Sequence, residues 1–338
     1  RRQRRRRRLL LEPLEDRRLL AVAASLSAAQ AADQPVAIAI HGGAGTISRS
    51  QMTAEREKAY LAALQDAVEA GHRILESGGS SLDAVTEAVR LLEDSPLFNA
   101  GKGAVFTHDG RNELDAAIMD GATLNAGAVA GLHHVRNPIQ LARAVMEKSP
   151  HVFMVGDGAE EFALEQGIRL VPRDYFYTEE RWQRLQRARE RERAALPQTD
   201  KFGTVGAVAL DRAGNLAAAT STGGLTNKRY GRIGDVPVIG AGTYANNAAC
   251  AISATGDGEY FIRSVVAYDI AARMMYADAK LEQAATEVIG TKLVDMGGGG
   301  GVIGVDRYGN VAMVMNTPGM YRASIDANGQ RVVRIFAD

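Results

Sequence analysis

Apolar residues recur along this chain at two spacings, and the spacing changes from segment to segment. A short apolar run over residues 36–40 predicts a strand. Over residues 53–76 and 80–94 the apolar side chains fall three and four positions apart, which predicts two amphipathic helices. The hydroxyl of Ser80 suits the N-cap of the second helix. Further helices are expected over about residues 137–150, 259–276 and 280–296.

Three segments carry the strand–turn–strand pattern of β-hairpins: residues 104–119, 205–222 and 301–317. Their turns are expected at the glycine-containing stretches 108–110, 211–215 and 306–310. Hairpins favour antiparallel sheets, and the amphipathic helices must cover the faces of those sheets. The pattern therefore predicts an α+β fold, a four-layer αββα sandwich with two mostly antiparallel sheets between helix layers.

The composition is that of an ordinary globular protein, with 338 residues of which 46% are hydrophobic and 24% charged. Residues 1–32 hold nine Arg, and the rest of the chain holds 31 Lys and Arg against 37 Asp and Glu. The body is therefore mildly acidic, which disfavours nucleic acid as a partner. The single cysteine, Cys250, excludes an internal disulfide and a Cys-rich zinc site. No apolar run approaches the roughly 18 residues that a membrane-spanning helix needs.

The N-terminal segment, residues 1–32, has several features of a targeting signal. A basic start and Arg17-Arg18 precede a small, apolar run that ends in an A-x-A-like sequence, Ala29-Gln30-Ala31. We expect an export leader and hence a periplasmic or extracellular protein. The alternative is a disordered basic arm on a cytoplasmic protein.

Candidate chemistry centres on Thr204, which follows Gly203 and opens an apolar strand pattern. Residues 175–203 are rich in Arg and Glu and poor in aliphatic residues, which predicts a mobile, partly helical and solvated linker. If the Gly203–Thr204 bond were cut, one residue would carry both a nucleophilic hydroxyl and an amine that can act as its base. The structural alternative is a glycine that turns the chain before a threonine that suits a strand. Residues 220–224 and 254–259 add hydroxyls and backbone N–H groups of the kind that stabilise an oxyanion.

Six motifs resemble, in the same order, those of the isoaspartyl peptidase and plant-type L-asparaginase family of N-terminal-nucleophile hydrolases. They are His41-Gly42-Gly43-Ala44-Gly45, Ser95-Pro96-Leu97-Phe98-Asn99-Ala100-Gly101, Gly203-Thr204-Val205-Gly206, Ser221-Thr222-Gly223-Gly224, Gly231-Arg232-Ile233-Gly234-Asp235 and Thr255-Gly256-Asp257-Gly258-Glu259. The resemblance covers about residues 36–322. It implies a zymogen that cuts itself at Gly203–Thr204 into an α-subunit, residues 33–203, and a β-subunit, residues 204–338. The mature enzyme would hydrolyse β-aspartyl dipeptides and the side-chain amide of L-asparagine without an organic cofactor.

The resemblance also implies a role for each residue of the reacting centre. Thr204 would be the nucleophile, and Thr222 would hydrogen-bond to it and orient it. Thr255 and Gly256 would form the oxyanion hole, and Asn99 would lie close to the nucleophile.

The substrate would be held by a second set of residues. Arg232 would bind the α-carboxylate, to which its guanidinium fork is suited. Asp235 would bind the α-ammonium group, and Gly258 would line the same pocket. Asp257 departs from some relatives, because a carboxylate stands there where they have an uncharged residue.

The segment from Leu92 to Lys102 resembles the family's sodium loop, in which backbone carbonyls surround a structural cation. Carbonyl oxygens suit a hard cation without a cluster of acidic side chains. The implied ligands are the carbonyls of Leu92, Glu93, Ser95, Phe98, Ala100 and Lys102. The resemblance further implies a heterotetramer of two processed protomers.

Two other functions remain open at this point. Glycosylasparaginase activity would fit an exported protein, and it needs room for a sugar beyond the leaving group. A protein that stays uncleaved and binds aspartyl groups without turnover belongs to a different class. A catalytic zinc site is disfavoured because the chain has no H-E-x-x-H motif, and the adjacent His133 and His134 project differently.

Overall fold

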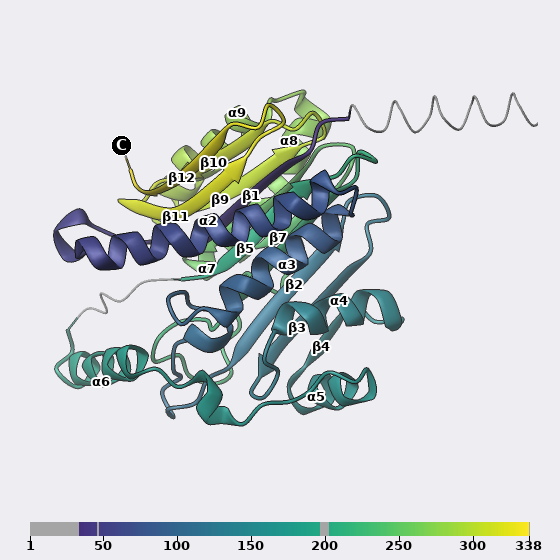
Figure 1. Cartoon of the computed structure of the whole chain (residues 1–338). Helices are drawn as coiled ribbons and strands as arrows, with labels where there is room; N and C mark the ends of the chain where they lie inside the picture. The colour runs from purple at the N-terminus through teal and green to yellow at the C-terminus, as the bar shows by residue number, and fades with distance from the viewer. Residues whose placement is uncertain (1–33, 46, 197–202, 338) are drawn as a thin grey trace, which may run out of the picture. The chain divides into compact units, whose positions relative to one another are not determined.

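The computed structural model describes residues 34–45, 47–196 and 203–337. Pro35–Asp338 forms one compact unit, shown in Figure 1. The predicted leader, residues 1–32, and residues 197–202 of the predicted linker lie outside the described residues. Among the helices that are described, none is long and apolar enough to cross a membrane.

Within the described residues, the larger sheet has eight strands in the order β12-β11-β1-β5-β6-β2-β3-β4. Their bounds are β1 Ala37–Gly45, β2 Leu114–Asp120, β3 Ala126–Leu132, β4 Phe153–Val155, β5 Val205–Leu210, β6 Leu216–Thr222, β11 Gly319–Ile325 and β12 Arg331–Phe336. Neighbouring strands are antiparallel except β3 and β4, which are parallel. Strand β5, which begins directly after Thr204, lies between β1 and β6 near the middle of this sheet.

The smaller sheet of the described chain has four strands in the order β10-β9-β8-β7. Their bounds are β7 Thr243–Ala245, β8 Cys250–Gly256, β9 Gly300–Asp306 and β10 Val311–Met315. All pairs in it are antiparallel. Small side chains such as Ala37, Ala39 and Ala218 of the larger sheet pack with Ala251 and Ala254 of the smaller one, and this lets the two sheets lie close together.

Helices cover the outer face of each sheet (Figure 1). The larger sheet packs against α2 Ala54–Glu76, α3 Ser81–Asp94 and α4 Pro138–Lys148, and the smaller sheet against α8 Val266–Ala277 and α9 Leu281–Glu287. The other helices are α5 Gly156–Glu165, α6 Glu179–Arg193, α7 Gly258–Ser264 and α10 Leu293–Asp295, with short 3-10 turns at Arg49–Gln51, Gly101–Gly103 and Arg173–Phe176 and a π-helical turn at Val288–Lys292. The predicted αββα sandwich is confirmed.

Local sequence signals set several boundaries where they were predicted. The side chains of Thr53 and Ser80 accept backbone N–H groups at the starts of α2 and α3. The hairpins over residues 205–222 and 301–317 are present as β5–β6 and β9–β10. The helix expected over residues 259–276 is instead two helices, because Val265 has a left-handed backbone with φ 50°.

The hairpin expected over residues 104–119 is wrong. Strand β2 pairs with β3 and β6, and residues 104–107 form no strand. The side chain of Asn112 donates to the carbonyls of Ala104 and Val105, at 3.0 and 3.1 Å, so these groups are satisfied without a ladder. The sequence pattern did not reveal this side-chain contact.

The predicted linker is partly helical, as expected, but its helix is not solvated on every side. Helix α6 buries Arg181, Leu185 and Ala188. The Arg181 guanidinium donates to the carbonyls of Leu97 and Gly103, and Trp182 packs edge-on against Phe106. The guanidinium group of Arg181 thus anchors α6 to the rest of the protein. A count of aliphatic residues does not predict such an anchor.

Candidate active site

Thr204 lies at the start of β5, where its side chain meets the end of β6. Its residue is 8% exposed, and its hydroxyl donates to the Thr222 hydroxyl at 3.2 Å. The Thr222 hydroxyl in turn donates to the carbonyl of Gly203 at 3.1 Å and accepts from the backbone N–H of Gly224 at 3.0 Å. The predicted nucleophile and its predicted partner are therefore in contact, and both reach the Gly203–Thr204 peptide.

The Gly203 carbonyl also accepts a hydrogen bond from Asn99 Nδ2 at 2.7 Å. The Asn99 amide is fixed on every side, because Nδ2 also donates to Gly224 O at 2.8 Å and Oδ1 accepts from Val105 N at 2.9 Å. Two donors thus converge on one carbonyl. They would stabilise negative charge on its oxygen during attack at its carbon.

Strand β1 brings the His41–Gly45 segment against the same peptide. Gly43 lies at an irregularity in the pairing of β1 with β11, with φ 113°, where a side chain would be strained. A Cβ at this position would lie 2.9 Å from Gly203 Cα and 3.3 Å from Thr204 N. Only a bare backbone fits this close to the candidate cleavage point.

Thr255 lies next to the end of β8 and contacts this segment. Its hydroxyl is fully buried and accepts from the backbone N–H of Ala44 at 3.2 Å. Gly256, the next residue, packs directly on the backbone of Gly299 and Gly300. The structure therefore brings the two predicted oxyanion-hole residues to the segment that contacts Thr204.

Arg232, Asp235 and Gly258 converge from two separate segments. A Cβ at Gly258 would lie 2.7 Å from Arg232 Nη2 and 2.9 Å from Asp235 Oδ1. Asp235 Oδ2 is buried and has no hydrogen-bond partner among the described residues. Burial raises the pKa of the Asp235 carboxyl to about 7, while the Arg232 charge opposes this shift. A buried carboxyl oxygen without a partner suits an ammonium group.

Sequence reasoning missed the partner of Arg232. The guanidinium Nε and Nη2 both donate to the Glu259 carboxylate, each at 2.8 Å, in a bidentate pair. Glu259 is the last residue of a motif that was recognised, but the motif gave it no role. A substrate carboxylate would have to share or displace this pair.

A buried cluster of charges beside Thr222 was also missed. Asp115 lies directly across from Thr222 in the pairing of β2 with β6. Burial raises the pKa of Asp115, and the nearby charge of Lys228 opposes the shift. Lys228 Nζ, itself buried, lies 3.3 Å from Glu113 Oε2. The charged pair Glu113 and Asp115 at the start of an apolar strand was a signal that could have revealed this cluster.

The candidate cation loop, residues 92–102, begins in the last turn of α3 and contains Asn99. Gly101 and Gly103 leave room for the carbonyls of Glu93, Phe98 and Pro96, because a Cβ at either glycine would overlap or crowd these oxygens. The Glu93 side chain, fully buried, accepts from the Ser221 hydroxyl at 2.7 Å and so links this loop to the strand of Thr222. The described residues contain no group of three or more His, Cys, Asp or Glu side chains that could hold a metal ion.

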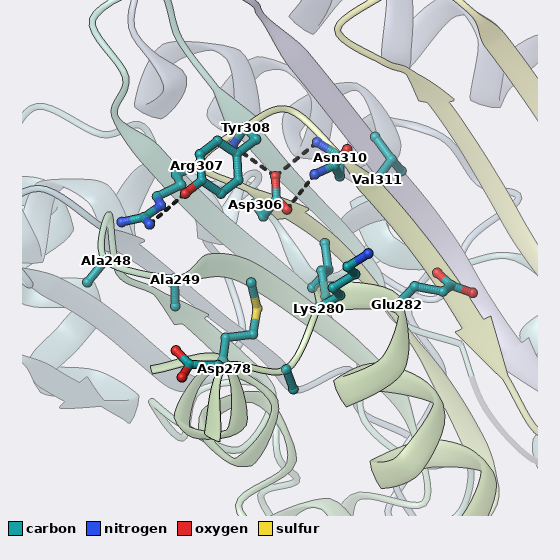
Figure 2. A pocket seen from close by; sticks show the side chains of 13 residues that line it. Ala248, Ala249, Asp278, Lys280, Glu282, Asp306, Arg307, Tyr308, Asn310 and Val311 are labelled. Atoms are coloured by element: carbon teal, nitrogen blue, oxygen red, sulfur yellow. Dashed lines mark hydrogen bonds between the residues drawn. The ribbon is translucent and has the colours of Figure 1, made fainter. Parts of the chain in front are cut away.

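A separate hollow of about 550 Å³ lies near the turn between β9 and β10 (Figure 2). It is remote from the site along the strands, because Asp306 pairs with Cys250 at one end of β8 and Gly301 pairs with Thr255 at the other. Both oxygens of the Asp306 carboxylate accept hydrogen bonds within the turn, from Tyr308 N and from Asn310. The Asp306 carboxylate therefore stabilises the turn between β9 and β10.

The four-layer sandwich, with Thr204 at the start of a central strand and donors aimed at the carbonyl before it, defines the class of N-terminal-nucleophile hydrolases. The family described as Asparaginase matches residues 34–335, and the chain belongs to this family.

The chain is similar to curated proteins over most of their length. It is 58% identical to an isoaspartyl peptidase of Salmonella typhimurium over 293 residues, which cover 85% of this chain and 94% of that protein. It is 57% identical to an isoaspartyl peptidase of Escherichia coli, with 85% and 91% of the two chains covered. An isoaspartyl peptidase/L-asparaginase of Bos taurus is 42% identical over 85% of this chain and 91% of its own length.

Proposed function

We propose that this protein is a self-cleaving isoaspartyl peptidase and L-asparaginase. The observation that carries the proposal is the Gly203–Thr204 peptide itself. Its carbonyl accepts from Asn99 and Thr222, and the Thr204 hydroxyl lies within hydrogen-bond distance of Thr222. The names of the similar proteins support the substrate class.

In self-cleavage, Thr204 Oγ attacks the Gly203 carbonyl carbon. The peptide C–N bond breaks, the proton of the hydroxyl passes to the Thr204 nitrogen, and an ester joins Gly203 to Thr204. Water then cleaves the ester, which leaves a carboxylate on Gly203 and a free amine and hydroxyl on Thr204. Asn99 and Thr222 stabilise the oxyanion of the first step.

In turnover, the freed amine takes the proton of Thr204 Oγ as it attacks the side-chain carbonyl of the substrate. Ammonia or an amino acid leaves with that proton, and water releases aspartate from the acyl-enzyme. Thr255 and Gly256 stabilise the oxyanion. Arg232 binds the α-carboxylate and Asp235 the α-ammonium group, so the substrate must present both.

Two further parts belong to the proposal. A sodium ion held by backbone carbonyls between Leu92 and Lys102 would fix the loop that carries Asn99. Two processed protomers would associate as a heterotetramer. The division into subunits 33–203 and 204–338 follows from the proposed cleavage point.

The test is intact mass under denaturing conditions, followed by a turnover assay. We expect two fragments, one ending at Gly203 and one beginning at Thr204, and release of aspartate from β-aspartyl dipeptides and L-asparagine. Faster turnover of a glycosylated asparagine would favour glycosylasparaginase. A chain that stays intact and releases no aspartate would favour the uncleaved binding protein.

A further inference from the structure

A chain of buried polar groups runs from the nucleophile into the layer between the two sheets. His41 Nδ1 lies 3.1 Å from the carbonyl oxygen of Thr204, and His41 Nε2 lies 2.9 Å from Ser253 Oγ. Ser253 Oγ lies 2.7 Å from Thr220 Oγ1, which lies 2.7 Å from Thr243 Oγ1. His41, Ser253, Thr220 and Thr243 are each fully buried. The proposed reaction uses none of these four side chains.

The chemistry of the groups fixes the direction of every hydrogen bond in this chain. A carbonyl only accepts, so His41 Nδ1 carries a proton and donates to Thr204 O. Burial lowers the pKa of His41 to about 3, so the ring is neutral and its Nε2 only accepts.

The donor of each remaining hydrogen bond follows from the donor of the bond before it. Ser253 must donate to His41, so the proton between Ser253 and Thr220 belongs to Thr220. Thr220 thus donates to Ser253 at 2.7 Å rather than to Gly242 O at 3.3 Å, and Thr243 donates to Thr220 at 2.7 Å rather than to Val236 O at 3.1 Å. All donors therefore point toward the Thr204 carbonyl, and successive bonds polarise one another.

The bare backbone of Gly206 makes room for these hydrogen-bonded side chains. Gly206 lies directly across from His41 in the pairing of β1 with β5. A Cβ on Gly206 would overlap both Ser253 Oγ and His41 Nε2. The four polar side chains come from β1, β8, β6 and β7, so the chain of bonds ties both sheets to one carbonyl.

We propose that His41, Ser253, Thr220 and Thr243 are positioning residues that hold Thr204 in place once it has become a chain terminus. The inference rests on the proposed function, in which Thr204 is freed by cleavage. Terminal residues are poorly ordered unless they are tied down. The hydrogen bond from His41 survives cleavage, because His41 donates to the carbonyl of Thr204 and not to the Gly203–Thr204 peptide that is cut.

This role separates the two reactions of Thr204. During self-cleavage, peptide bonds hold Thr204 on both sides, and Asn99 and Thr222 hold the adjacent Gly203 carbonyl. During turnover, the restraint from Gly203 is gone. Loss of these buried hydrogen bonds should therefore slow turnover more than self-cleavage. A general loss of folding would slow both alike.

The experiment compares four variants with the unaltered protein. Ser253→Ala removes the donor to His41, and Thr220→Val removes a more distant hydroxyl at nearly constant volume. Thr220→Ser keeps that hydroxyl and serves as the conservative rescue. Ser264→Ala is the matched control, because it removes a buried hydroxyl that donates to Tyr260 O, outside the chain. Intact mass over time gives the rate of self-cleavage, and β-aspartyl dipeptide hydrolysis by the cleaved protein gives kcat and KM.

Misplacement of a reacting group by about 1 Å can cost on the order of a hundredfold in rate. For Ser253→Ala we expect kcat to fall about tenfold, with KM and the rate of self-cleavage changed less than about threefold. Thr220→Val should show the same split to a smaller degree, while Thr220→Ser and Ser264→Ala should match the unaltered protein. If Ser253→Ala does not fold, the comparison of Thr220→Val with Thr220→Ser tests the inference.

A spectroscopic readout reports the tie directly. Nitrogen NMR of imidazole-labelled protein should show His41 neutral and protonated at Nδ1 throughout the range from pH 5 to 8, and Ser253→Ala should shift the Nε2 resonance, which loses its hydrogen-bond donor, while Nδ1 stays protonated. Equal losses in self-cleavage and kcat, no loss in either, or an Nε2-protonated His41 would each overturn the inference. Failure of the unaltered protein to cut or to turn over would instead refute the proposed function.

Discussion

Replacement of Asn99 by aspartate tests the proposed self-cleavage most directly, because it changes one atom in the site. Asn99 Oδ1 accepts from Val105 N, and the new side chain can keep that bond. The other carboxyl oxygen would replace Nδ2, which lies 2.7 Å from Gly203 O and 2.8 Å from Gly224 O. Asn99→Asp therefore turns a donor shared by two carbonyls into an acceptor that faces both.

The magnitude follows from the loss of one oxyanion donor. Such a loss typically costs about 10²–10³ in rate, or roughly 3–4 kcal/mol of transition-state stabilisation. Thr222 remains as the second donor, so self-cleavage should slow by this factor without being abolished. Repulsion from two carbonyls and burial both disfavour the ionised carboxyl, which raises its pKa above the usual value of about 4.

The pH dependence carries a definite sign. A protonated carboxyl can donate to the Gly203 carbonyl, and an ionised one cannot. The ratio of the variant's cleavage rate to that of the unaltered protein should therefore rise as pH falls from 8 to 5. Intact mass against time measures both rates. Asn247→Asp is the matched control, because Asn247 Nδ2 also donates and its Oδ1 also accepts from a backbone N–H, but its contacts, Asn215 and Leu216, lie at the end of β6 opposite to Thr222. A ratio near one at pH 8, or a ratio that does not change with pH, would refute the reasoning.

Five further predictions concern this site and the candidate cation loop beside it. Thr204→Ala should give a single uncut chain by intact mass, and normal cleavage would overturn its assignment as nucleophile. Arg232→Lys should raise KM about tenfold to a hundredfold through loss of a bidentate contact, with a smaller change in kcat, and an unchanged KM would contradict the assignment. Only the ionised Asp235 binds an ammonium group, so KM should rise as pH falls below about 7, and Asp235→Asn should remove this dependence. Because folding raises this pKa, the free energy of unfolding should fall as pH rises from about 4 to 7, and denaturant titration of Asp235→Asn should show a flatter profile. Exchange of sodium for tetramethylammonium should lower Tm in calorimetry, since a cation bound only to the folded state stabilises it.

The fold was predictable from the sequence where local contacts decide the structure. Thr53 and Ser80 cap their helices through neighbours three residues away, and Asp211 and Asp306 close their turns through backbone groups within four residues. The hairpin expected over residues 104–119 failed because a side chain, that of Asn112, satisfies two carbonyls in place of a ladder. No periodicity reports such a contact.

The site was predictable only in part, for a related reason. The resemblance placed Arg232, Asp235 and Gly258 in one pocket, and the structure brings these three residues together. It gave no role to Glu259, the bidentate partner of Arg232. His41 and Ser253 are 212 positions apart, and their contact depends on the sheet-to-sheet packing and on the bare backbone of Gly206. Residues that act through long-range packing left no local signal in the sequence.

The two proposed reactions share one hydroxyl but place their oxyanions differently. In self-cleavage the oxyanion forms on Gly203 O, which the structure shows between Asn99 and Thr222. In turnover the oxyanion belongs to the substrate and would meet Thr255 and Gly256.

The attacking atom can serve both reactions only if its own position is independent of Gly203. The bonds that meet this condition are the pairing of β5 with its neighbours, the bond from the Thr204 hydroxyl to Thr222 and the His41 contact to Thr204 O, since none of them involves Gly203. A threonine that must react before and after its chain is cut is thus best held through its carbonyl.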